Sequence, residues 1–195
     1  SYHSDYANIL TTAGTEDIDI VGTLLVVGQN LSGGSYSNYE GAVGWGTSAI
    51  PDGATISAAT VSLDGNADHS DTDFTVYAAV YDYTDGGTNG LAAADYRTQA
   101  QVQAFSPVAS WDSSGYSAGY NDFADIDLIA NVNKTGYTFL LFWSSRFEAG
   151  TTPSGAEYVQ FSTAEVAGTT SDPKLVVEYT VIQTISPNGI ASALA

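Results

Sequence analysis

The chain contains no cysteine and no methionine among its 195 residues. Without cysteine, neither a disulfide framework nor thiol chemistry is available to it. Only 4 residues are Lys or Arg, against 22 Asp or Glu, and the formal net charge is −18. Such a surface repels the phosphates of nucleic acids and anionic lipid headgroups, so we expect neither as a partner. No apolar run is long enough to span a bilayer, and the sequence therefore predicts no membrane insertion.

Signals for helices are also scarce. Glycine occurs 20 times, and over most of the chain apolar residues recur at every second position, the period of a half-buried β-strand. Residues 48–63 show this most clearly, because Pro51, Asp52 and Gly53 form a turn and a regular alternation follows from residue 55. The segment predicts a strand that starts directly after a tight turn.

The same reasoning predicts a series of strands separated by turn clusters. They cover residues 18–28, 36–46, 55–64, 74–83, 101–109, 123–128, 137–144, 158–162 and 174–181. A short helix is expected at residues 90–98. The continuous apolar run at residues 139–143 predicts a central strand buried on both faces.

These elements predict an all-β fold, an antiparallel jelly-roll β-sandwich in a single domain. The domain is expected to span residues 18–181. Residues 1–17 show little pattern and are expected to form an extended N-terminal segment. Residues 182–195 follow the last strand as a linker or as a strand that pairs with another subunit. As a donor strand this tail would use its larger apolar side chains, Ile182, Ile185, Ile190 and Leu194.

The densest acidic segment places side-chain oxygens at nearly every second position. Its members are Asp64, Asn66, Asp68, Asp71 and Asp73. A hard cation such as Ca²⁺ takes oxygen ligands, and a tight loop can turn them inward. The segment therefore predicts a Ca²⁺ site in a loop between two strands, with a solvated loop as the alternative.

Several aromatic residues occur in polar surroundings rich in glycine and serine. They are Tyr36, Tyr39, Trp111, Tyr116 and Tyr120. Exposed tyrosine and tryptophan rings can stack on sugars or anchor a protein interface. The alternative is that these rings cap the edges of the sandwich.

Few residue combinations point to catalysis. The chain has two histidines, His3 and His69, and no Gly-x-Ser-x-Gly motif. We therefore expect no enzymatic activity. A hydrolase with paired carboxylates stays an alternative, because only distances in space can show which acids face each other.

Residues 50–56, Ile-Pro-Asp-Gly-Ala-Thr-Ile, begin a pattern that continues along the chain. Asn-Lys-Thr-Gly-Tyr-Thr precedes the apolar strand at residues 133–138, and Asp-Pro-Lys-Leu-Val-Val-Glu-Tyr closes the domain at residues 172–179. From about residue 24 to residue 180, the chain resembles the DNRLRE-like β-sandwich modules of bacterial surface proteins and of phage tail or virion proteins. It departs from the surface-protein members at Trp45 and Gly46, where an Arg-containing strand is typical.

The resemblance implies a non-catalytic module that serves structure or adhesion. We accordingly expect a structural subunit of an extracellular or virion assembly, such as a phage tail, a fibre or a surface filament. Its partners would be copies of itself or adjacent subunits, bound through β-sheet edges and stabilised by Ca²⁺. The alternative function is an adhesin that binds host or cell-surface glycans.

Overall fold

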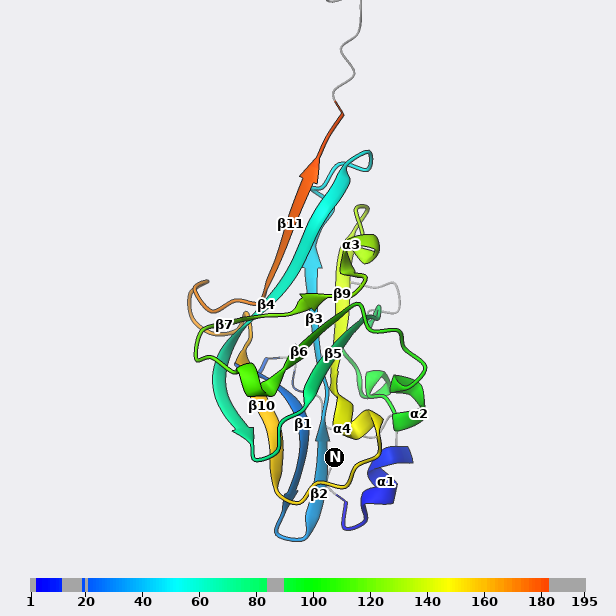
Figure 1. The fold of residues 1–195 in the computed structure, drawn as a ribbon, viewed down its shortest axis with the longest axis vertical. Coiled ribbons are helices and arrows are strands. Elements are labelled where there is room, and N and C mark those ends of the chain that lie inside the picture. The colour runs from blue at the N-terminus through cyan, green and yellow to red at the C-terminus, as the bar shows by residue number, and fades with distance from the viewer. Residues whose placement is uncertain (1–2, 12–18, 20, 84–89, 183–195) are drawn as a thin grey trace, which may run out of the picture.

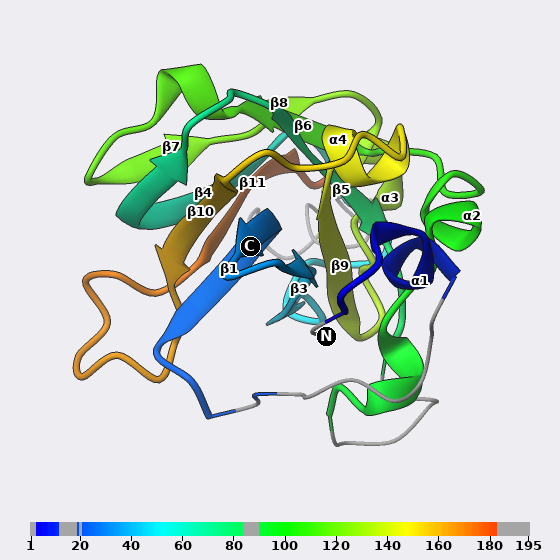
Figure 2. The same ribbon diagram turned by 90° about the horizontal axis from the view of Figure 1, so that it is seen from below.

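The computed structural model describes residues 3–11, 19, 21–83 and 90–182. Two antiparallel sheets face each other (Figures 1 and 2), which confirms the predicted all-β sandwich. The first sheet has the order β11-β4-β10-β1-β2, with β7 also paired to β4, and the second has the order β3-β9-β5-β6-β8. The first sheet comprises β1 (Leu24–Ser32), β2 (Ser35–Tyr39), β4 (Thr55–Ser70), β7 (Tyr120–Asp122), β10 (Ala156–Ser162) and β11 (Lys174–Thr180). The second comprises β3 (Gly41–Gly46), β5 (Thr75–Val80), β6 (Ala109–Asp112), β8 (Ala124–Asp125) and β9 (Tyr137–Ser144).

Short helices connect or cover these strands. They are α1 (Tyr6–Thr11), α2 (Gln99–Val102), α3 (Leu128–Asn131) and α4 (Ser145–Glu148), with 3-10 turns at Ala93–Asp95 and Ser113–Gly115. In Figure 2, α1, α2 and α4 lie together beside β9 and β5. They cover the face of the second sheet that points away from the first.

Two apolar cores result from this arrangement. The main core fills the space between the sheets and includes Trp111, Phe123 and Phe161, whose rings contact one another. The second core lies under the helices, where Trp143 of β9 packs with Phe147 and other buried side chains. Since alternate residues of β9 enter the two cores, the strand is buried on both faces, as the apolar run at residues 139–143 predicts.

Some predicted elements differ from the structure. Residues 101–109 do not form a strand, because α2 and a turn precede β6 there. Thr98 and Gln101 form a capping box at the start of α2, a signal that the strand prediction missed. The predicted strand at residues 36–46 is two strands, since the chain passes from the first sheet to the second at Glu40.

Other boundaries also change. The N-terminal segment is not wholly extended: α1 buries Tyr6 and Ile9. The helix expected at residues 90–98 is reduced to the 3-10 turn Ala93–Asp95, and the strand expected at residues 123–128 divides between β8 and α3. In each case local propensity is overridden by the packing of a short segment on a sheet.

Candidate functional site

The closing strand β11 lies at the end of the first sheet. One edge pairs with β4, from Lys174 opposite Ser62 to Thr180 opposite Thr55. No strand among the described residues pairs with its other edge. We call β11 and the paired part of β4, residues 55–62, the β4–β11 ribbon, and Figure 1 shows it reaching beyond the other strands of the sandwich. A row of backbone donors and acceptors is therefore open along β11.

The alternation of β11 explains its orientation. Leu175 and Val177 are partly buried against the main core. Lys174, Val176 and Glu178 are exposed on the opposite face. The strand is thus held in place by one apolar face, and the other face stays accessible.

Exposed apolar side chains concentrate at this edge. Nine large apolar side chains are exposed in the described part of the chain, and four of them lie within residues 176–182. These four are Val176, Tyr179, Val181 and Ile182, the last with 84% of its surface exposed. An apolar patch beside an open strand edge is typical of a site of protein association.

The other described end strands are shorter and carry no exposed large apolar side chain. β8 has only 2 residues. The outer edge of β2 already bonds to the N-terminal segment, because the amide of Tyr36 donates to the carbonyl oxygen of His3 at 2.7 Å. No described strand pairs with the outer edge of β3 either, but β3 carries no exposed large apolar side chain, and the Nε1 of its Trp45 donates to the carbonyl oxygen of Pro173. At 7 residues, β11 is the longest end strand of either sheet.

One of the predicted donor-strand residues lies just beyond the end of this ribbon. Ile182 is the only one of the four that the structure describes, and its side chain is exposed next to β11. Ile185, Ile190 and Leu194 lie outside the described residues. The role of the tail as a donor strand stays a prediction.

The acidic segment is not the loop that the sequence predicted. Asp64, Asn66 and Asp68 belong to β4, which continues to Ser70 because its C-terminal half pairs with β10. The loop prediction is therefore wrong for these residues. Only Asp71 and Asp73 lie in the connection between β4 and β5.

The individual acids of this segment have protein partners instead. Asp68 accepts from the amide of Ser70 at 2.8 Å, and Asp73 accepts from the Oγ of Ser113 at 3.0 Å. In the described ranges, no group of three His, Asp or Glu side chains is placed to hold a metal ion. Calcium binding stays a prediction, and no preformed acidic cluster in the described residues supports it.

The five predicted aromatic residues do not form one surface. Trp111 is buried in the main core, so its expected role as an exposed ring is wrong. Tyr116 packs against the same core. The Tyr120 hydroxyl donates to the carbonyl oxygen of Thr170 at 2.7 Å.

The remaining two lie on different elements of the fold. Tyr36 contacts Tyr6 of α1, with ring centroids 5.5 Å apart. Tyr39 lies on β2, where it meets a tyrosine from a strand that is not its direct neighbour.

That contact belongs to a row of rings on the outer face of the first sheet. Tyr39 and Tyr158 have ring centroids 5.4 Å apart, and Tyr158 and His69 have centroids 4.8 Å apart. The two tyrosines meet across Gly28, which pairs with both of them and has φ +134°. Because Gly28 has no side chain, rings from β2 and β10 come together over β1. The sequence could not show this, since it depends on the register of three strands.

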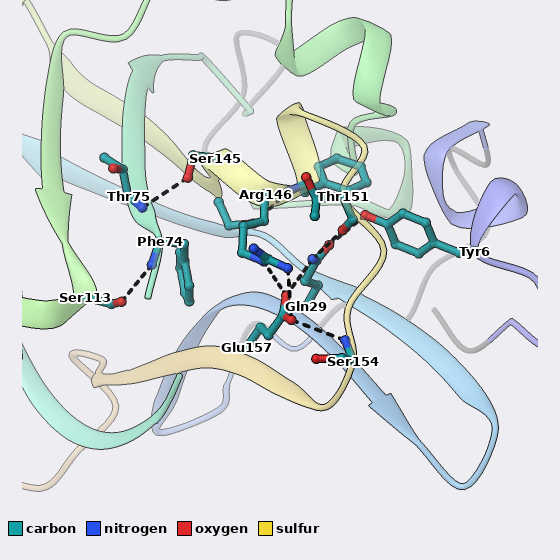
Figure 3. Close-up of polar contacts among 12 residues, drawn as sticks. Tyr6, Gln29, Phe74, Thr75, Ser113, Ser145, Arg146, Thr151, Ser154 and Glu157 are labelled. Carbon is teal, nitrogen blue, oxygen red and sulfur yellow. Dashed lines mark hydrogen bonds and ion pairs between the residues drawn. The ribbon is translucent and has the colours of Figure 1, made fainter. Parts of the chain in front are cut away.

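A buried polar cluster joins the two sheets near α1 (Figure 3). Glu157 of β10 is fully buried and accepts hydrogen bonds from Arg146, Gln29 and the amide of Ser154. The Tyr6 hydroxyl donates to the Oε1 of Gln29 at 2.7 Å. Burial and the neighbouring Glu157 carboxylate raise the pKa of Tyr6. Each polar group of this cluster is satisfied by the protein, as expected of a structural network.

A second polar cluster surrounds Glu40, at the point where the chain changes sheets. Its carboxylate accepts from the backbone amide of Arg97 at 2.9 Å and from the Nδ2 of Asn38 at 3.1 Å. The Glu40 side chain is half-buried. The protein that surrounds its carboxylate raises the pKa of Glu40 to about 8, because burial disfavours the charged form. The Oδ1 of Asn38 and the Nε of Arg97 are buried without a hydrogen-bond partner among the described residues.

Comparison with known proteins does not assign the chain to a family. No protein-family model matches the chain, and neither does any curated protein. In the described residues, no helix has the length and apolar character needed to cross a membrane. The fold and the site thus define an antiparallel β-sandwich with one open, apolar edge strand.

Proposed function

We propose that this protein is a non-catalytic structural subunit of an extracellular or virion assembly, and that subunits associate through the open edge of β11. The observation that carries the proposal is the β4–β11 ribbon, a projecting strand edge with apolar side chains exposed along it. Strand addition at such an edge gains affinity from backbone hydrogen bonds and specificity from alternate side chains.

The charge distribution also favours this edge. The whole chain carries a formal charge of −18, so most surfaces of two copies repel each other. Residues 174–182 contain one basic residue, Lys174, and one acidic residue, Glu178, and are therefore neutral. Two copies can therefore approach at β11 with less repulsion than at the acidic parts of the surface.

The polar clusters support a structural role in place of catalysis. The Glu157 carboxylate is enclosed and accepts hydrogen bonds from protein donors, so neither of its oxygens faces solvent. A glycoside hydrolase requires a pair of carboxyl groups. Glu157 pairs with Arg146 instead of a second acid. We infer that these groups hold the sandwich together.

The experiment is a measurement of molar mass in solution for matched variants. Val176→Lys places a charge on the open edge, and Val80→Lys makes the same change at another exposed valine, at the end of β5 in the other sheet. We expect the unmodified chain and V80K to form species larger than 20.3 kDa, and V176K to remain a monomer. Equal association of V176K and V80K would contradict the proposal.

A second candidate function is glycan binding at the ring row formed by Tyr39, Tyr158 and His69. Half-buried aromatic rings on a sheet face can stack on the apolar faces of sugars. Tyr158→Ala should then abolish any glycan-array signal, and Tyr137→Ala, at an exposed tyrosine of β9, should retain it. A folded protein that gives no signal on the array would remove this candidate.

A further inference from the structure

The outer face of β11 carries opposite charges at a symmetric spacing. Lys174 and Glu178 are exposed on the same face, each two residues from Val176. Lys174 is one of only 4 basic residues in the chain. Its Nζ lies 3.4 Å from the centre of the ring of Tyr120 on β7, a cation–π contact on the same face of the sheet.

We propose that two copies of the chain pair their β11 strands antiparallel, about a twofold axis that passes Val176. This inference rests on the proposed function and specifies its partner and register. In this register Lys174 of each copy lies opposite Glu178 of the other, Leu175 lies opposite Val177, and Val176 lies opposite itself. The first sheets of the two sandwiches then join into one continuous sheet.

Geometry restricts the alternatives. In an antiparallel pair, directly opposite residues have their side chains on the same face, so a twofold axis between identical strands must pass a residue. Centring the pair on Leu175 places Glu178 opposite Asp172, and centring it on Glu178 places that residue opposite itself. Both registers oppose like charges. Centring on Val177 places Glu178 opposite Val176 and leaves Lys174 without an acidic partner.

The register centred on Val176 is therefore the one that pairs both charges. It also brings together the exposed Val176 side chains of the two copies, of which 52% is accessible in one copy. Leu175 and Val177 extend the partly buried inner face of the ribbon across the junction. Opposite-charge and apolar cross-strand pairs are the contacts that stabilise an antiparallel sheet.

A cysteine cross-link tests the register, because the natural chain contains no cysteine. In the proposed pair the two Val176 Cα atoms are about 4.5–5.5 Å apart, within the span of roughly 4.4–6.8 Å that a disulfide bridges. The two Thr180 Cα atoms are separated by about 26 Å along the strands. Under mild oxidation, V176C should form covalent dimers and the control T180C should not.

A charge exchange provides the second measurement. K174E and E178K each place like charges opposite each other twice per dimer, and either change should weaken association about tenfold. The double variant K174E/E178K restores both pairs and should associate like the natural chain. An equimolar mixture of K174E and E178K should form the mixed dimer. The control E165K makes the same charge change as E178K at an exposed residue before β11 and should leave association unchanged.

The outcomes separate this inference from the proposed function. Cross-linking of V176C together with rescue in the double variant supports the register. If V176K abolishes association but T180C forms cross-links, or the double variant does not restore association, the register is wrong. Assembly through β11 is then still supported. A natural chain that is monomeric at every concentration overturns both.

Discussion

Arg146 and Glu157 form a bidentate ion pair between the two sheets of the sandwich. The Nε of Arg146 lies 2.5 Å from one carboxylate oxygen of Glu157, and its Nη2 lies 3.1 Å from the other. Arg146 belongs to α4, beside the second sheet, and Glu157 belongs to β10 of the first. The pair therefore connects the two layers that position the β4–β11 ribbon.

Removing the arginine should strongly destabilise the fold. Arg146→Met leaves a fully buried carboxylate without its positive partner, which costs about 3–5 kcal/mol. Urea unfolding measures the loss as a lower midpoint with an unchanged slope. The double variant R146M/E157Q should recover part of the loss, since it leaves no buried charge. A cost below about 1 kcal/mol for R146M would show that Glu157 does not depend on the pair.

Gly28 should tolerate no side chain. A Cβ at this position would lie 2.3 Å from the carbonyl oxygen of Glu157, and the backbone φ is +134°. We expect Gly28→Ala to lower the free energy of unfolding by roughly 2–4 kcal/mol through strain and the displacement of β10. Gly53→Ala is the matched control, because a Cβ there meets nothing within 4 Å, and it should change stability by less than about 0.5 kcal/mol. Equal effects of the two substitutions would refute this account.

Glu40 should make stability depend on pH. Its pKa is raised by burial from 4.5 to about 8, so between these values the folded chain holds a proton that the unfolded chain has released. The free energy of unfolding should therefore fall as pH rises from about 4.5 to about 8, by at most about 1.4 kcal/mol per pH unit from this group. Above that window its contribution is constant.

Glu40→Gln tests this dependence because it removes the titrating group. The stability of E40Q relative to the natural chain should increase steadily across the same window. Urea unfolding at several pH values measures the difference. Two stability profiles that run parallel from about pH 4.5 to about pH 8 would show that the Glu40 carboxylate is not the cause.

Local sequence patterns predicted the strands in which buried and exposed residues alternate or in which a continuous apolar run is buried. The strand expected at residues 137–144 coincides with β9, and the closing strand expected at residues 174–181 differs from β11 by one residue. The helix α1 was missed because its stability comes from burying Tyr6 and Ile9 against other elements. Tertiary packing, and not helical propensity, makes this short helix.

The candidate site was less predictable than the fold. That residues 174–180 form a strand follows from their alternation, but their place at the end of a sheet depends on pairing with β4, more than 100 residues earlier. The same holds for the contact of Gln29 with Glu157, which are separated by 128 residues. Sequence periodicity carries no information on which strands become neighbours.

Backbone amide exchange of the unmodified protein, at low and high protein concentration, tests assembly through β11 most directly. If subunits associate through β11, amides of Lys174–Thr180 exchange more slowly at high concentration, whereas amides of Gly41–Gly46 in β3, an end strand of the second sheet, do not change. Exchange that is independent of concentration in β11, or new protection confined to β3, would contradict this assembly.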